Sequence, residues 1–397
     1  MHTLIIKAAH QEEELLMATL ERFRRDMGVD LDFGSLEDII EQDLSLVFVA
    51  TGGTEMQFLN ILDQLPGKIY LLTHPAHNSL AASLEILTYL QNQGRQGEIL
   101  HGSPQEVGER VKEILHFKEV REKLSRHRLG VIGVSDWLIA SDVDYERVKE
   151  LTGMEFIRLE VDELLEEVKK GGYEANEWTE KLLKIGYNKG EMDKALEVYG
   201  ALSRLIEKHD LTGFSLRCFD ILDPLDTTAC LALAILNAQG YPSGCEGDQK
   251  SLLSMVVSQE LLEESVFMAN PSELDPVKEQ LVIAHCTIPL DYPDKVYLNT
   301  HFESGIGVGV ASDFDFEEVT LFKMDSFENF VAKEGVLLES LHRSDLCRSQ
   351  MRLHLPGAMD YFLKYPISNH HMVLRGHHAD LLERFLKEIA GDIKRRD

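Results

Sequence analysis

Carboxylate and imidazole side chains gather in two stretches that lie far apart in the sequence. Glu246 and Asp248 stand two residues apart in Cys245-Glu246-Gly247-Asp248, directly after an apolar run. Histidines return in pairs near the C-terminus, as His370-His371 and His377-His378. Carboxylate oxygens combined with an imidazole nitrogen suit a hard or borderline divalent cation such as Mn²⁺. The pattern therefore predicts a metal-assisted enzyme.

A second group of acids lies upstream, between a strand-like run at 213–216 and an apolar helix expected over 227–237. It comprises Asp220, Asp223 and Asp226. Asp-Pro and Asp-Thr steps are common in turns and helix caps, so most of these carboxylates are expected to be structural. One of them, at the end of a strand, is a candidate for facing the metal. For Glu246 or Asp248 taken alone, the alternative is a solvated loop position.

Three other positions are candidates for binding substrate or supporting the ligands. His285 and His301, the latter close to Glu303, are weaker histidine candidates than the C-terminal pairs. Trp137 follows an expected strand at 129–134, and ligands of open α/β sheets bind at the carboxyl ends of strands. An exposed indole there could stack on a sugar ring, and packing between domains is the alternative.

Apolar strands alternate with amphipathic helices through the first 240 residues, which favours parallel sheets covered on both faces. The expected strands include 4–6, 44–50, 68–73, 129–134 and 156–159. From about Gly240 strands follow one another directly, at 281–284, 295–298 and 318–322, and a helix over 379–390 closes the chain. We therefore expect an α/β protein with two tandem Rossmann-like (flavodoxin-like) domains and a mostly antiparallel, β-rich C-terminal domain, divided as 1–122, 123–240 and 241–397.

Composition excludes several classes of protein. The net charge of −28 argues against a nucleic-acid or anionic-membrane partner, and a neutral sugar is compatible with it. No apolar run reaches the roughly 18 residues of a membrane span, and the N-terminus lacks a signal-peptide pattern, so we expect a cytoplasmic protein. The five cysteines form no disulfide framework. We expect them to be buried as small apolar side chains, with structural zinc the alternative.

Several of these elements occur together in one known group of enzymes. They are Arg217-Cys218-Phe219-Asp220, Asn237 to Pro242, Cys245 to Asp248, Ala284 to Thr287, and Ser368 to Leu381. In order and spacing the chain resembles the L-fucose isomerase and L-arabinose isomerase superfamily, closest to its shorter, fucose-isomerase-like members. The resemblance covers roughly residues 213–390, and the combination is more specific than any single motif.

The resemblance implies a Mn²⁺ site in which two acids and one histidine bind the metal and the acids double as the proton-transfer pair. It assigns Asp248 and His370. The first acid is usually a Glu after the Arg-Cys-aromatic element, and none is present here, so Asp220 takes the role with Asp223 in reserve. Aspartate reaches roughly 1.5 Å less far than glutamate, which matters for a proton acceptor. Substrate-binding or supporting roles are expected for Trp137, Arg217, Glu246, His285, His301 and His377.

The implied activity is that of a ketol isomerase, an intramolecular oxidoreductase. It would convert a fucose- or arabinose-like aldose into the ketose through an enediol, with carboxylates moving a proton between C1 and C2. The alternatives are a sugar-binding or regulatory protein on the same scaffold and another metal-assisted sugar reaction. Relatives form homo-oligomers in which a neighbour's first domain covers the site. By that resemblance, Thr51–Thr54 and His74–Ser79 would be contributed in trans.

Overall fold

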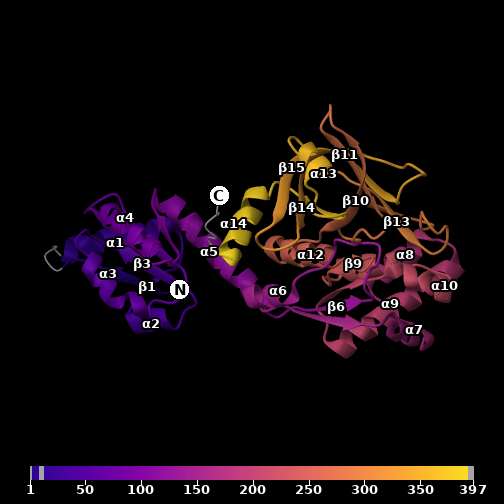
Figure 1. Ribbon diagram of the computed structural model, residues 1–397, viewed down its shortest axis with the longest axis horizontal. Helices are drawn as coiled ribbons and strands as arrows, with labels where there is room; N and C mark the ends of the chain where they lie inside the picture. Colours follow the sequence, from indigo (N-terminus) through magenta and orange to yellow (C-terminus); the bar gives the residue numbers. More distant parts are fainter. Residues whose placement is uncertain (1, 9–12, 392–397) are drawn as a thin grey trace. The chain divides into compact units, whose positions relative to one another are not determined.

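The computed structural model of the protein describes residues 2–8 and 13–391 (Figure 1). Two compact units make up the chain, the first extending to Glu119 and the second comprising Val120–Ala390. Across the described residues, no helix combines the length and the apolar character needed to cross a bilayer.

A five-stranded parallel sheet forms the first unit, in the order β2-β1-β3-β4-β5. This is the flavodoxin-like strand order. The strands are β1 (His2–Ile6), β2 (Asp32–Gly34), β3 (Ser45–Val49), β4 (Ile69–Leu72) and β5 (Gly97–Leu100). The helices are α1 (Glu13–Met27), α2 (Leu36–Ile40), α3 (Glu55–Ile61), α4 (Ser79–Asn92) and α5 (Pro104–Leu124), and α5 carries the chain into the second unit.

Both faces of this sheet are buried, as the continuous apolar strands predict. Leu46 and Phe48 of β3 join the core cluster that contains side chains of α1 and α5. Val47 and Val49 point to the opposite face and join the cluster with side chains of α3 and α4. The alternation of side chains along one strand thus produces two cores, one on each face.

One ion-pair network in this unit should make stability depend on pH. Glu98 of β5 accepts hydrogen bonds from Arg110 at 2.8 and 2.9 Å and from Lys68 at 3.1 Å. Burial alone would raise the pKa of Glu98, but these two cations outweigh burial and lower it. A lowered folded-state pKa stabilises the protein above the ordinary glutamate pKa, and the contribution is lost as the pH falls through the folded value.

We expect Glu98→Gln to cost about 1.5–3 kcal/mol of unfolding free energy at neutral pH. The difference from the wild type should shrink toward zero below about pH 4. Urea unfolding of both proteins at neutral pH and below about pH 4 measures this difference in unfolding free energy. Glu109→Gln, which removes an exposed pair with Lys112, is the control and should change stability little. A Glu98→Gln deficit of equal size at both pH values would contradict this linkage.

A second parallel sheet, in the order β7-β6-β8-β9, begins the second unit. Its strands are β6 (Arg128–Ile132), β7 (Glu155–Leu159), β8 (Gly213–Leu216) and β9 (Ser243–Cys245). The order repeats that of the first sheet with one strand fewer. The associated helices are α6 (Tyr145–Thr152), α7 (Val161–Lys169), α8 (Glu177–Ile185), α9 (Lys189–His209), α10 (Leu222–Leu225), α11 (Cys230–Ala238) and α12 (Gln249–Leu262).

A closed antiparallel barrel follows, with the strand order β10-β11-β16-β15-β14-β17. It comprises β10 (Phe267–Asp275), β11 (Gln280–His285), β14 (Glu318–Met324), β15 (Phe330–Ser340), β16 (Ser349–His354) and β17 (His371–Arg375). A separate ribbon pairs β12 (Lys295–Asn299) with β13 (Gly309–Asp313), and the helices α13 (Met359–Lys364) and α14 (Ala379–Ala390) complete the unit.

The expected fold class is confirmed, because two parallel-sheet α/β regions precede an antiparallel β-rich region (Figure 1). The strands expected at 281–284, 295–298 and 318–322 and the helix over 379–390 all form. The division of the chain at residues 122 and 240 stays a prediction. β9, which follows residue 240, pairs with β8 in the second parallel sheet.

Candidate metal centre

The loop between β9 and α12 presents the two carboxylates of the Cys245–Asp248 stretch. β9 ends at Cys245, and Glu246 and Gly247 both adopt left-handed backbone conformations, with φ of 61° and 67°. A Cβ at position 247 would lie 2.9 Å from the carbonyl oxygen of Gly133, so the close approach requires glycine. Asp248 then caps α12 by accepting a hydrogen bond from the backbone of Ser251 at 2.8 Å. Left-handed non-glycine residues are costly and cluster at functional sites.

Two histidines of the barrel face Glu246. His285 is the last residue of β11, and His370 directly precedes β17. The Oε1 atom of Glu246 lies 3.4 Å from Nε2 of His370 and 3.9 Å from Nε2 of His285. The ligand atoms of the three residues all lie within 4.8 Å of one another. The cluster thus joins the carboxyl edge of the second parallel sheet to the barrel.

The donor atoms of this cluster fit a divalent cation. Within the described part of the chain, Nε2 of His285 and Nε2 of His370 are both buried and lack a hydrogen-bond partner. A buried polar atom without a partner is costly and calls for an explanation such as an ion. Ligand atoms bound at 2.0–2.2 Å stand about 3–3.6 Å apart around a cation. The Glu246–His370 separation of 3.4 Å falls in that range, and the Glu246–His285 separation of 3.9 Å is slightly longer. Carboxylate and imidazole suit Mn²⁺, Zn²⁺ or Fe²⁺, so the donors do not identify the metal.

The electrostatics of the cluster keep Glu246 anionic and His285 neutral, the forms that bind a cation, and leave a proton on His370. Burial would raise the pKa of Glu246, but His370, His285 and the Trp137 indole lower it to about 2. Burial together with neighbouring His370 lowers the pKa of His285 to about 3, so this ring is neutral. Burial disfavours charge on His370 too, yet the carboxylates of Glu246 and Asp248 raise its pKa to about 9. A bound cation would take the place of that proton.

Asp248 lies on the other side of the His370 ring. Its Oδ2 atom is 2.9 Å from Nδ1 of His370 and accepts a hydrogen bond from the Ser251 hydroxyl at 2.7 Å. Lys323 of β14 lies 3.6 Å from the same oxygen. The side chains of Asp248, His370 and Lys323 are all essentially inaccessible to solvent. Glu246 therefore faces one nitrogen of the ring and Asp248 the other.

An aromatic wall adjoins Glu246. The Trp137 indole donates to Oε2 of Glu246 at 3.2 Å. Phe219 meets Trp137 edge to face at 5.5 Å between ring centroids, and His301 meets Phe219 at 6.1 Å. The guanidinium of Arg217 lies 4.9 Å from the centre of the Trp137 ring. Such a wall offers ring faces to apolar groups of a ligand and polar edges to its hydroxyls.

Asp220, the expected first acid, lies in the short 3-10 helix Cys218–Ile221 that follows β8. Its Oδ1 atom is 3.1 Å from Nε of Arg217, and its side chain is 36% exposed. The three ligand atoms that approach one another do not include this carboxylate. Metal binding by Asp220 and Asp248 therefore stays a prediction, whereas His370 lies in the cluster.

The four neighbouring histidines separate in space. His371 contacts the Tyr361 hydroxyl at 2.7 Å through Nε2. His377 contacts the carbonyl oxygen of Gly335 at 3.1 Å, and His378 that of Arg375 at 2.7 Å. Of the four, His370 contributes to the cluster with Glu246 and His285.

Two contributors to the site carried weak sequence signals. Glu246 and His285 were expected in supporting roles, but their atoms complete the cluster. Lys323 and Ser251 were not singled out at all. A lysine inside the otherwise apolar run Leu321-Phe322-Lys323-Met324 was the available signal, because lysine is almost never fully buried unless it is paired.

Four of the five cysteines are buried, and Cys347 is partly exposed. All five are free, and Cys218, Cys230, Cys245 and Cys286 are buried. The sulfur atoms of Cys218 and Cys245 lie 3.1 Å apart, directly beside Arg217 and Glu246 in the chain.

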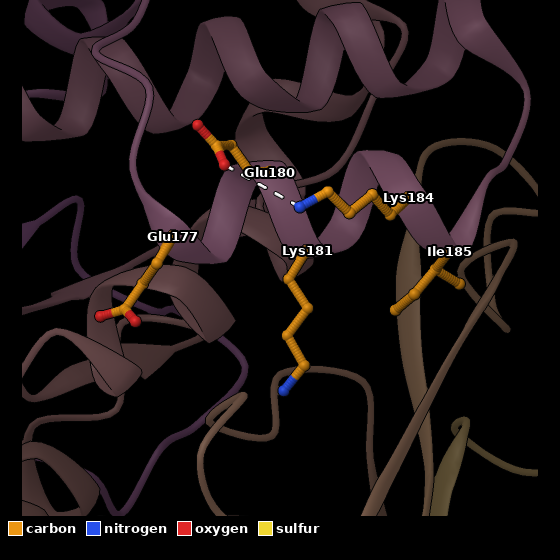
Figure 2. Close-up of a pocket in the computed structure, with 5 residues that line it drawn as sticks. All are labelled: Glu177, Glu180, Lys181, Lys184 and Ile185. Carbon is orange, nitrogen blue, oxygen red and sulfur yellow. Dashed lines mark ion pairs between the residues drawn. The ribbon is translucent and has the colours of Figure 1, made fainter.

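A hollow elsewhere in the unit shows none of this chemistry. α8 carries an open pocket of about 430 Å³, and Figure 2 shows its lining side chains, Glu177, Glu180, Lys181, Lys184 and Ile185. Lys184 pairs with Glu180 at 4.0 Å. These are ordinary residues of a solvated helix face, and the pocket contains no member of the metal cluster.

Comparison with known proteins supports a distant relationship to one enzyme. No known family model matches the chain. Over 95 residues it is 28% identical to a protein named sulfoquinovose isomerase from Clostridium sp. (strain MSTE9). The match covers 24% of this chain and 21% of the relative, so the aligned stretch spans about a fifth of that protein. The similarity is to an enzyme named as a sugar isomerase.

Proposed function

We propose that the protein is a metal-dependent sugar isomerase that interconverts an aldose and a ketose. The observation that carries the proposal is the pair of buried Nε2 atoms of His285 and His370, which find no hydrogen-bond partner among the described residues and lie beside the anionic Glu246. The distant likeness to a protein named sulfoquinovose isomerase supports the same reaction class. The earlier resemblance to fucose and arabinose isomerases supports it too, and Mn²⁺ is our proposed cation.

The chemistry requires a proton to move between C1 and C2 of the open-chain sugar and between their oxygens. A divalent cation on the two oxygens would lower the pKa of the hydroxyl and stabilise the enediolate. Glu246, His285 and His370 would hold the cation. Trp137 keeps the Glu246 carboxylate oriented through its indole N–H, and the wall formed with Phe219 and His301 would pack against the carbon chain.

Proton transfer needs a carboxylate with access to the substrate. We propose Asp220 for this role, because its carboxylate is partly exposed and its neighbour Phe219 forms part of the wall. Arg217 would hold it in place, since the same guanidinium is fixed by the Val134 carbonyl and by Asp136. In its finer form, the proposal is that the protein is a homo-oligomer and acts on a neutral sugar of the fucose or arabinose type.

The test is an assay of the full chain with Mn²⁺ and a panel of aldoses in D₂O, including L-fucose, L-arabinose and sulfoquinovose. We expect ketose formation and deuterium incorporation at C2 for at least one aldose, and loss of both after chelation with EDTA. Proton NMR detects the exchange. Absence of exchange with every aldose by protein that binds metal would overturn the proposed isomerase. Aldose binding without exchange would instead favour a sugar-binding or regulatory protein that uses the same scaffold.

A further inference from the structure

We propose that Lys323 and Asp248 form a buried charge pair that positions His370 for metal binding, rather than binding the metal themselves. The inference rests on the metal site of the proposed function and extends it to residues behind the ligands. It assigns a positioning role to Lys323 of β14, which contacts Asp248 and Ser251.

Hydrogen-bond donors occupy both oxygens of the Asp248 carboxylate. Oδ1 accepts from the backbone N–H of Ser251 at 2.8 Å, and Oδ2 accepts from the Ser251 hydroxyl at 2.7 Å. Oδ2 also lies 2.9 Å from Nδ1 of His370. Both oxygens are thus engaged, and the side chain is 1% exposed. A carboxylate held in this way acts on a metal through the histidine that it touches.

The contact with Asp248 determines which nitrogen of the His370 ring carries the proton and which carries the lone pair. A carboxylate at Nδ1 accepts the N–H there and leaves the lone pair on Nε2 when the ring is neutral. Nε2 of His370 is the atom 3.4 Å from Glu246 and without a hydrogen-bond partner in the described residues. Asp248 therefore selects the nitrogen that faces the cluster and fixes the plane of the ring.

Lys323 supplies a counter-charge to the buried Asp248 carboxylate. A buried carboxylate without a counter-charge is strongly unfavourable, and so is a buried ammonium group. Lys323 is completely buried, its Nζ donates to the Ser251 hydroxyl at 2.8 Å, and it lies 3.6 Å from Oδ2 of Asp248. The Ser251 hydroxyl thus links the two charges, donating to Asp248 and accepting from Lys323.

The charge pair joins the start of α12 to the barrel. Ser251 and Asp248 belong to the start of α12, directly after Glu246, whereas Lys323 belongs to the barrel. A further contact joins the same two elements, because the backbone N–H of Met324 donates to the Ser254 hydroxyl at 3.0 Å. The charge pair therefore holds the Glu246 loop against the barrel that carries His285 and His370.

The experiment measures Mn²⁺ affinity of the full chain by calorimetry, without sugar. We expect Lys323→Met to weaken binding about 10- to 100-fold while the binding stoichiometry stays at one. Lys250→Met, which removes a neighbouring lysine paired with Asp325 at 3.9 Å, is the matched control and should bind as the wild type does. Ser251→Ala keeps both charges and removes the hydroxyl between them, so it tests the same link if Lys323→Met does not fold.

Spectroscopy separates positioning from ligation. With Co²⁺ bound, Asp248→Asn should keep the visible absorption bands of the wild type, because the ligand set is unchanged, and should bind more weakly. Altered bands in Asp248→Asn would make Asp248 a ligand and overturn the proposal. So would equal Mn²⁺ affinity of the wild type, Lys323→Met and Ser251→Ala, or the absence of metal binding by the wild type. Failure to isomerise any aldose, with the affinity differences present, would refute the proposed activity alone.

Discussion

Glu246→Gln is expected to lower Mn²⁺ affinity by about 10² to 10⁴-fold and to abolish isomerisation. The figure follows if about 10–16 kcal/mol of metal-binding energy is shared among the three clustered ligands, since 1.4 kcal/mol corresponds to a factor of ten. Glutamine has nearly the shape of glutamate, so packing against Trp137 should survive. The loss therefore reports the missing negative charge beside His285 and His370. Calorimetric titration and the C2 exchange assay measure the two effects.

The control for this change is Glu264→Gln. Glu264 is half exposed and pairs with Arg375 at 3.3 Å, outside the cluster. The Glu264→Gln variant should bind Mn²⁺ as tightly as the wild type. Thermal unfolding of both variants checks that neither has lost its fold. Wild-type Mn²⁺ affinity in Glu246→Gln would show that this residue is not a metal ligand.

The fold followed from local patterns because most of its elements carry their own periodicity. The apolar run at 44–50 became the fully buried β3, and the amphipathic run at 379–390 became α14. β9 was not anticipated, since Ser243-Gly244-Cys245 is short and contains no β-branched residue. Its pairing with β8 depends on tertiary packing, which single-strand propensity does not encode.

The candidate site was predictable in its chemistry and less so in its geometry. In a strand, two acids two residues apart, such as Glu246 and Asp248, would share a face. The left-handed turn at Glu246 and Gly247 separates them instead, so that they approach opposite nitrogens of His370. Turn conformation at a non-glycine residue has no reliable sequence signal.

The partners of these acids depend on contacts between residues distant in the chain. His285 reaches Glu246 because β11 ends beside the loop after β9, and Lys323 reaches Asp248 because β14 packs on α12. The family resemblance alone distinguished His370 from its neighbour His371 in the sequence. They diverge because one turns to Asp248 and the other to Tyr361. Such choices are settled by packing between the sheet and the barrel.

Asp220→Asn is expected to lower kcat by about 10² to 10⁴-fold, the contribution of a positioned acid or base, while Mn²⁺ affinity stays unchanged. The reason is geometric: the Asp220 carboxylate pairs with Arg217 beside the aromatic wall and is not among the three clustered ligand atoms. Asp136→Asn removes the other carboxylate paired with Arg217 and serves as the matched control. It should retain most of the activity, because Asp136 contributes to fixing Arg217 and has no proposed part in proton transfer.

The split between affinity and turnover is what identifies the proton-transfer residue. A fall in Mn²⁺ affinity in Asp220→Asn would instead make this carboxylate a ligand, as the family resemblance implies. Wild-type turnover in Asp220→Asn together with loss in Asp223→Asn would transfer the role to Asp223, which lies three residues further on in α10. Restoring glutamate, as Asp220→Glu, extends the carboxylate by roughly 1.5 Å. If reach limits proton transfer in this chain, Asp220→Glu should exchange deuterium at C2 faster than the wild type.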